Sequence, residues 1–234
     1  MAEQDENPVS ELARLSADAM EILLDEAEDE NMFSEALRLN GENMEILKLI
    51  CNHPGTPPEV RAEAARALGI GGPAGKKAAG TPGGQKPART EEAKRESIAN
   101  KIRGLTVGEK IRISVKAGRE ARSQLLKDAN KQVVLGVMAN PRITVSEVEM
   151  AARSRSMPEE ALREIAKNKE WVKSYSVIYN LVSNAKTPPG VSLGFLPWLK
   201  SKDLHLLVRN KDVPDAVRTA ARKFAETRDR KRQS

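Results

Sequence analysis

A short helix break recurs along this chain and constrains its fold more than any other sequence feature. In the stretch from Asn140 to Val148, Asn-Pro ends one apolar helical run. Thr144 can then cap the next helix, with Glu147 as its capping-box partner. Related breaks occur at residues 52–60 and 184–191. Repeated breaks with caps predict a stack of short helices, and they indicate architecture rather than chemistry.

The composition favours helix-on-helix packing. Aromatic residues make up only 3% of the 234 residues, so the core must consist mainly of Leu, Ile, Val, Met and Ala, which suits an all-α fold better than a β-sandwich. The one strand-like alternation, Lys110–Val115, lies between a capping signal at Thr106 and Gly118. We therefore predict a helix there as well.

Charge is distributed unevenly along the chain. Residues 1–70 hold 5 Lys/Arg and 16 Asp/Glu, a balance of −11, whereas residues 71–234 hold 34 and 17, a balance of +17. A Gly/Pro/Lys-rich stretch that can bury little separates the two regions. These shifts predict four parts: an acidic helical module at 8–69, a disordered linker at 70–90, a basic helical region at 91–227 and a disordered tail at 228–234.

Apolar periodicity predicts many short helices. The acidic module should hold four, the last capped by Thr56 with Pro57 at its first position. In the basic region, 171–182 and 191–199 each read as one helix. Helices of about 8–14 residues, paired roughly every 28 residues and joined by short breaks, cannot bury their apolar faces alone. We therefore predict that they stack into an α-solenoid.

Several stretches carry a family likeness. They are Gly108-Glu109-Lys110-Ile111, Gly118-Arg119-Glu120-Ala121-Arg122, Asn140-Pro141-Arg142-Ile143-Thr144 and Asn184-Ala185-Lys186-Thr187-Pro188. The pattern resembles the leucine-rich-repeat-variant branch of HEAT-like α-solenoids, and residues 104–227 are similar to uncharacterised bacterial proteins. The resemblance implies a right-handed solenoid that acts as a protein-interaction scaffold, with no catalytic residues.

The sequence offers little for catalysis, cofactors or metals. A single cysteine, Cys51, excludes an internal disulfide and a cysteine-based metal site. His53 and His205 each lack a suitably spaced second ligand, so we read both as structural. A small enzyme using Cys51 or His53 is the least favoured alternative. We expect no enzyme activity, no metal and no cofactor.

Nucleotide and calcium binding are also disfavoured. The Gly-rich stretch 69–77 has Lys77 where a phosphate-binding P-loop needs Ser or Thr. The acidic run 25–30 lacks the spacing and the glycine of a calcium loop. It reads as a solvated helix end, with a docking patch for a basic surface as the alternative. No secretory signal or membrane-length apolar run is evident, so we expect a cytoplasmic protein with no membrane partner.

Basic residues near the helix breaks are the main functional candidates. In a solenoid, equivalent breaks of successive repeats could align these charges into a stripe that binds an acidic partner. We favour a protein partner, with nucleic acid contacted through its phosphate backbone as the alternative. The acidic module could also fold back on the basic region. The candidate binding residues are Arg142, Arg153, Arg155, Lys167, Lys169, Lys173, Lys186, Arg209 and Lys211.

Overall fold

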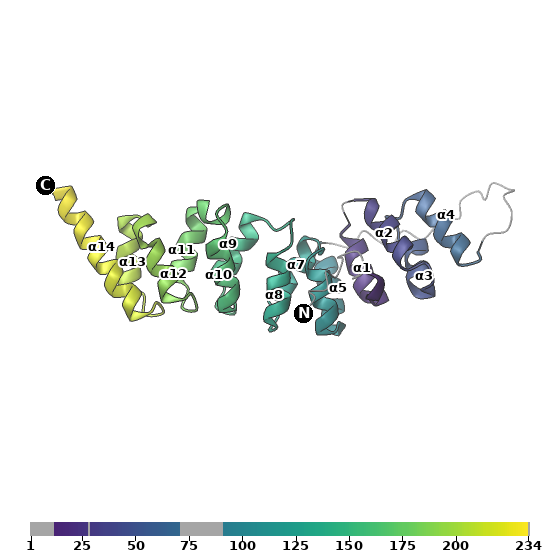
Figure 1. Ribbon diagram of the computed structural model, residues 1–234, viewed down its shortest axis with the longest axis horizontal. Coiled ribbons are helices and arrows are strands. Elements are labelled where there is room, and N and C mark those ends of the chain that lie inside the picture. Colours follow the sequence, from purple (N-terminus) through teal and green to yellow (C-terminus); the bar gives the residue numbers. More distant parts are fainter. Residues whose placement is uncertain (1–11, 28, 71–90, 234) are drawn as a thin grey trace, which may run out of the picture. The chain divides into compact units, whose positions relative to one another are not determined.

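The computed structural model describes residues 12–27, 29–70 and 91–233. These residues form fourteen α-helices and three 3-10 helices, and they contain no strand (Figure 1). The all-α prediction is therefore confirmed. The chain divides into two compact units, one before and one after the bond between Leu125 and Leu126.

The first unit combines the acidic helices with the first helices that follow residue 90. Helix α1 packs on α3 and also on α5 and α6, while α4 packs on α2 and α3. Its elements are η1 (Leu12–Arg14), α1 (Ala17–Asp25), α2 (Asn31–Leu39), α3 (Met44–Asn52), α4 (Pro58–Ala67), α5 (Glu91–Gly104), α6 (Val107–Ser114) and α7 (Arg119–Leu125).

Side-chain caps explain where several of these helices begin. The Ser16 side chain accepts a hydrogen bond from the Ala19 backbone N–H, and Asn43 caps α3 in the same way. Thr106 and Glu109 form the complete capping box expected at the start of α6. The predicted helix over 110–115 is thus confirmed, because α6 covers Val107–Ser114.

The predicted cap at Thr56 is wrong. Pro57 occupies the N-cap position, and α4 begins one residue later, at Pro58. The Thr56 side chain turns inward instead and donates a hydrogen bond of 2.6 Å to the Ile50 carbonyl. Thr56 is buried, so it ties α4 to the end of α3 rather than capping a helix.

Glu26 joins the acidic helices to α7. Its carboxylate accepts hydrogen bonds from the backbone N–H groups of Glu120, at 2.7 Å, and Ala121, at 3.1 Å. These donors belong to the first turn of α7, whose unpaired N–H groups and dipole favour a negative charge. Burial nevertheless raises the pKa of Glu26, outweighing the two backbone hydrogen bonds that lower it.

Gly118 makes this approach possible. A Cβ atom at this position would lie 2.4 Å from the Cβ of Glu26. The contact involves the base of the Glu26 side chain, so rotation of its flexible end would not relieve it. Glycine is therefore required at residue 118 for close approach.

Ion pairs reinforce the same junction. Lys101 lies 3.0 Å from Glu21 and 3.2 Å from Asp25, and Lys116 lies 3.2 Å from Glu35. Burial would raise the pKa of Asp25, but hydrogen bonds from His53 and Lys101 and the positive charge of Lys101 lower it overall. Asp25 and Glu26 therefore make specific contacts, in contrast to the predicted solvated helix end.

The division into units differs from the predicted domain boundary. Residues 12–70 and 91–125 pack together, and the chain divides after residue 125 instead. The physical reason is the contact of α1 with α5 and α6, together with the polar contacts of Glu26 and Lys101. Apart from Ile70, the predicted linker at 70–90 lies outside the described residues.

The second unit is a series of short helices that pack on neighbouring helices, most extensively α13 on α14, and in three cases on the next helix but one. Helix α8 packs on α10, α9 on α11, and α12 on α14. Its elements are α8 (Lys131–Met138), α9 (Val145–Arg153), α10 (Glu159–Lys167), η2 (Trp171–Lys173), α11 (Tyr175–Ser183), α12 (Pro189–Phe195), η3 (Leu196–Trp198), α13 (Ser201–Arg209) and α14 (Asp215–Gln233).

Two predicted helices are interrupted, and the predicted tail is helical. A 3-10 turn precedes α11 and another follows α12, so neither 171–182 nor 191–199 is one continuous helix. Helix α14 continues to Gln233, so the prediction of a disordered tail at 228–234 is wrong for all but Ser234, which lies outside the described residues. Arg228 anchors this helix by donating to the carbonyls of Pro197 and Leu199.

We predict that Gly118→Ala destabilises the protein by about 1–3 kcal/mol, because the added methyl group overlaps Glu26 in a packed junction. Urea unfolding of the full chain measures the change. Gly108→Ala is the matched control: no atom lies within 4 Å of the methyl group it adds. The control should be neutral or stabilising by up to about 1 kcal/mol. Equal effects of the two variants would refute the close-approach requirement.

We also predict an acid-sensitive contribution from Glu109. Hydrogen bonds from Ser16, and secondarily from Thr106, lower its pKa from 4.5 to about 2. A depressed folded-state pKa stabilises the protein above the unfolded value, and this stabilisation is lost as the pH falls from about 4.5 towards 2. Glu109→Gln should therefore make the acid-induced loss of stability shallower, as measured by urea midpoints across this range.

Glu26 provides a control of opposite sign for this experiment. Its pKa is raised in the folded state, so its protonation favours folding as the pH falls. Glu26→Gln should therefore make the loss of stability on acidification steeper. A Glu109→Gln profile that matches the parent protein would contradict the assignment.

Candidate functional site

Asparagine side chains form four of the turns between helices of the second unit. The Oδ1 atoms of Asn140, Asn168, Asn184 and Asn210 each accept a hydrogen bond from the backbone N–H two residues later, at 2.9–3.0 Å. This is an Asx turn, in which the side chain replaces a backbone carbonyl. The recurring break is therefore a structural device. Beyond the first asparagine, the Thr144–Glu147 capping box is complete, as the sequence predicts.

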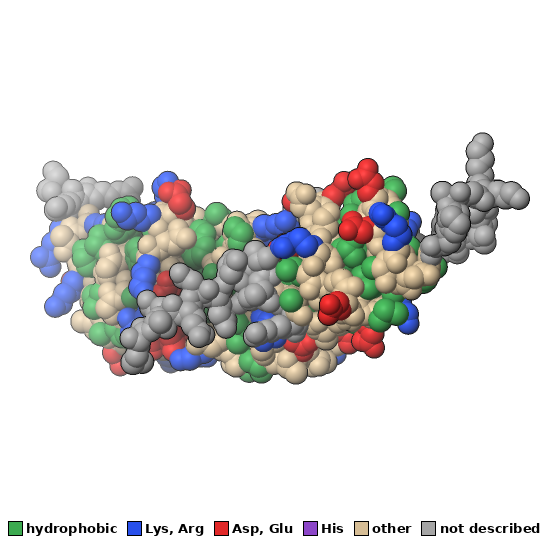
Figure 2. Space-filling view, turned by 45° about the vertical axis from the view of Figure 1, so that its right-hand side comes forward, with side chains coloured by type: hydrophobic (Ala, Val, Ile, Leu, Met, Phe, Trp, Pro, Cys, Tyr) green, Lys and Arg blue, Asp and Glu red, His purple; other side chains and the backbone are tan. Residues whose placement is uncertain are grey.

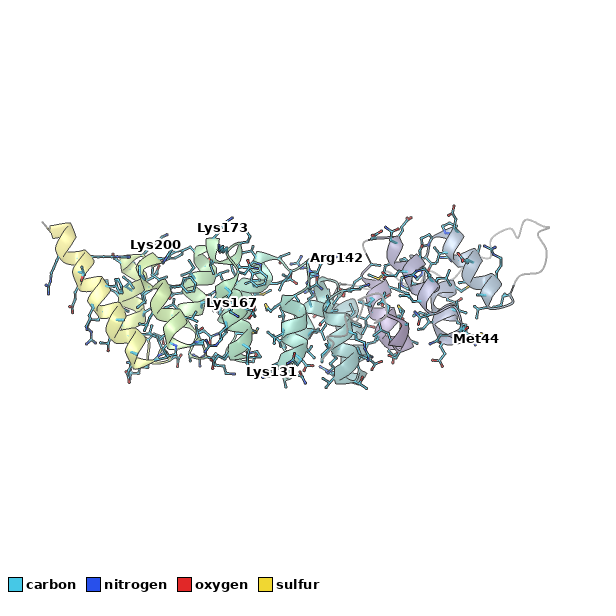
Figure 3. All side chains as sticks on the ribbon, viewed as in Figure 1. Met44, Lys131, Arg142, Lys167, Lys173 and Lys200 are labelled. Carbon is cyan, nitrogen blue, oxygen red and sulfur yellow. The ribbon has the colours of Figure 1, made fainter. Side chains whose placement is uncertain are left out.

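The breaks lie at two opposite edges of the second unit. Each helix carries the chain from one edge to the other, so successive breaks alternate between them. We call the edge formed by breaks 154–158, 184–188 and 210–214 the pocket edge, because residues from all three line one pocket. The opposite edge holds breaks 139–144, 168–174 and 196–200. Arg142, Lys173 and Lys200 lie along it in Figure 3.

The predicted basic stripe is thus split into two rows. Arg142, Lys167, Lys169 and Lys173 lie at or beside breaks of the opposite edge. Arg153, Arg155, Lys186, Arg209 and Lys211 lie at or beside breaks of the pocket edge. On the face drawn in Figure 2, Lys and Arg side chains form separate patches with other atoms between them.

Local partners neutralise much of the opposite edge. Lys167 pairs with Glu164 and Lys173 with Glu170, both at 2.7 Å and three residues apart. Such exposed pairs form within one turn and add little stability. Arg142 and Lys169 form no ion pair within the described chain. Fewer cations of this edge are therefore without an ion-pair partner than the sequence suggests.

Tyr175 forms a polar cluster at the opposite edge. Its hydroxyl donates to Asp203 and accepts a 3.0 Å hydrogen bond from the Lys200 backbone N–H. The Lys200 ammonium lies 4.7 Å from the centre of the Tyr175 ring. Burial, and then the hydrogen bond to Asp203, raise the pKa of Tyr175. The cluster ties break 196–200 to α11, and the sequence analysis did not identify it.

Fewer of the candidate cations on the pocket edge form ion pairs. Arg155 pairs with Asp212, but both side chains remain at least half exposed. The other four candidates of this edge, Arg153, Lys186, Arg209 and Lys211, are exposed. None of the four forms an ion pair with a residue that the structure describes. Arg153 and Arg209 are the last residues of α9 and α13. The helix dipole favours a positive charge at the C-terminal end of a helix.

The pocket edge encloses a polar pocket of about 320 Å³. Two predicted residues, Arg153 and Arg155, line it. The remaining lining comes from the two following breaks and from α11: Tyr179, Asn180, Ser183, Asn184, Ala185, Asn210 and Asp212. The structure therefore brings together two of the nine candidates with several uncharged polar side chains and with Asp212, none of which the sequence analysis singled out for binding.

Asn184 and Asn210 differ in the partners of their side-chain Nδ2 groups. The Nδ2 group of buried Asn184 donates to the carbonyls of Ala152, at 2.7 Å, and Ser154, at 2.9 Å. These bonds close the interval between two successive breaks of the pocket edge. The Nδ2 group of Asn210 makes no such bond to a described residue, and Asn210 lines the pocket together with residues of the other two breaks of this edge.

The other chemical candidates have structural partners. His53 Nε2 lies 3.1 Å from Asp25, and its Nδ1 accepts from the Gly55 N–H at 3.2 Å. His205 lies 3.1 Å from Asp229. Within the described ranges, no cluster of three or more His, Cys, Asp or Glu side chains is suited to hold a metal ion. None of the described helices combines the length and hydropathy needed to cross a bilayer.

Comparisons with protein-family models, with curated proteins and with solved structures give no match for this chain.

We predict that Asn184→Asp and Asn210→Asp have different effects on stability. Aspartate keeps the Oδ1 acceptor of each turn but replaces the Nδ2 donor with an oxygen. At Asn184 that oxygen would face two carbonyls at a buried site, costing about 2–4 kcal/mol. At Asn210 no such bond is lost, and the cost should stay below about 1 kcal/mol. Thermal and urea unfolding measure both, and equal losses would contradict this difference between the two side chains.

Proposed function

We propose that this protein is a non-enzymatic scaffold that binds an acidic segment of another protein along the pocket edge of its second unit. The observation that carries the proposal is the pocket itself, where arginines from one break face polar groups from two later breaks. Successive breaks are thereby aligned, and their cations form a row. An extended chain with acidic side chains is complementary to such a row.

The packing of alternate helices supports a repeat architecture for the second unit. Helices α8 and α10 pack together, as do α9 and α11, and equivalent Asx turns mark several of the breaks. We infer that these helices form an α-solenoid of the HEAT-like kind. Repeat stacks of this kind present extended surfaces that suit a peptide partner.

Acidic residues beside the row favour a protein partner over a nucleic-acid duplex. Glu159 and Glu160 open α10, and Asp215 opens α14, at the same edge. Cations at the ends of α9 and α13 therefore lie at an edge that also carries anions. Each of these carboxylates is paired with a cation, Glu159 with Arg163, Glu160 with Lys131 and Asp215 with Arg218. The edge is therefore a mixture of paired and unpaired charges, not the continuous positive surface that suits the closely spaced phosphates of a duplex. A single peptide can follow the cations alone.

We predict that removing cations from the pocket edge weakens binding to an acidic peptide. The probe is a fluorescein-labelled peptide of about ten glutamates, titrated with the full-length protein at about 50 mM salt, where electrostatic binding is strong. The two variants lose the same charge, one Arg and two Lys. The pocket-edge variant carries Arg153→Gln, Lys186→Gln and Lys211→Gln. The opposite-edge variant carries Arg142→Gln, Lys169→Gln and Lys202→Gln, where Lys202 is exposed in the first turn of α13, beside break 196–200.

The pocket-edge variant should bind at least about tenfold more weakly, whereas the opposite-edge variant should lose less than about threefold. Fluorescence anisotropy measures both affinities. Equal losses would show non-specific attraction and would contradict the proposal. A duplex DNA of about 20 base pairs is titrated in parallel. Tighter binding of the duplex, with a steep salt dependence, would instead support the nucleic-acid alternative.

A further inference from the structure

We propose that the pocket is a subsite for one carboxylate group, the side chain of an aspartate or glutamate in the acidic segment. The inference rests on the proposed function and specifies its anchoring contact. The pocket volume of about 320 Å³ accommodates a side chain of this size, and its lining supplies several donors from three chain segments.

The donors come from residues without other partners. The guanidinium of Arg153 forms no ion pair to a described residue, and the Nδ2 group of Asn210 makes no hydrogen bond to one. Ser183 also lines the pocket, and its hydroxyl has no hydrogen-bond partner among the residues described. Of these groups only the Ser183 hydroxyl is buried, where a polar group ordinarily has a partner, whereas Arg153 is exposed and Asn210 is half-buried, so both can reach a bound ligand. A bound carboxylate could supply acceptors for this set of donors.

The two asparagine turns of the pocket edge differ in one contact. Between breaks 154–158 and 184–188, the Asn184 amide donates to Ala152 and Ser154 and closes the interval. Between breaks 184–188 and 210–214, the Asn210 amide has the same Asx turn but no equivalent bond. The pocket therefore retains a free amide donor at a place where the previous repeat satisfies its own.

Charge in the pocket favours a carboxylate over a phosphate. Asp212 lines the pocket and pairs with Arg155. A phosphate would bring up to two negative charges close to Asp212, whereas a carboxylate brings one. A carboxylate is also planar and can accept two parallel hydrogen bonds from one guanidinium. The exposed Arg155–Asp212 pair is weak enough to share its arginine with the ligand.

The test uses the full-length protein, the labelled glutamate peptide and single substitutions with matched controls. Asn210→Asp keeps the turn but removes the amide donor and adds a negative charge. Asn168→Asp makes the same change in an Asx turn of the opposite edge. Arg153→Gln removes the free cation of the pocket, and Lys169→Gln removes one from the opposite edge. Thermal unfolding checks that each variant is folded.

We expect Asn210→Asp and Arg153→Gln each to weaken peptide binding by roughly tenfold, and the two controls by less than about threefold. Asp212→Asn should tighten binding, because it frees Arg155 and removes the repelling charge. In the ¹⁵N-labelled parent protein, the side-chain amide signal of Asn210 should shift on titration with the peptide, while that of Asn168 should not.

Other outcomes separate the subsite from the broader function. If the peptide binds but the pocket variants and their controls weaken it equally, the edge binds acidic chains without a carboxylate subsite, and this inference is wrong. If a peptide of alternating phosphoserine and glycine, matched in charge, binds the pocket more tightly, the preference for carboxylate is wrong. If the glutamate peptide does not bind the parent protein at all, the proposed function itself fails.

Discussion

The Asx turn is the interaction on which the second unit depends. Its helices contain mostly seven to nine residues, and isolated helices of this length are unstable in water. Each also leaves several backbone groups unsatisfied at its ends. By accepting a hydrogen bond from the second backbone N–H that follows, the asparagine reverses the chain within a few residues. Short helices can then pack on one another and satisfy their ends locally.

The same device links architecture to the proposed binding site. When the Oδ1 atom of an asparagine has formed the turn, its Nδ2 group can still donate hydrogen bonds. At Asn184 this group donates to the preceding break of the pocket edge. At Asn210 it makes no such bond, and the residue lines the pocket. A residue type that is structural at four breaks can therefore also be a binding residue at one of them. Sequence alone cannot distinguish the two cases, because both asparagines precede very similar turns.

Local features of this chain could be predicted from sequence, and long-range ones could not. The helical state of 110–115 and the capping box at Thr144 depend on neighbouring residues, and both are confirmed. The prediction of a cap at Thr56 is wrong because the Thr56 hydroxyl donates to a buried carbonyl six residues earlier in the chain. The pocket and the contact between Glu26 and Gly118 join residues far apart in the sequence. No periodicity or composition carries that information.

The junction at Glu26 has a consequence for the order in which the chain folds during synthesis. Glu26 is separated by 94 residues from its hydrogen-bond donor Glu120, so α1 leaves the ribosome long before α7 exists. Closing so large a loop is entropically costly, and long-range contacts of this kind form slowly. We expect the first unit to be completed only after residue 125 has emerged. Until α5 and α6 have emerged, α1 can pack only on α2 and α3, so a nascent chain stalled before that point would expose apolar groups to chaperones.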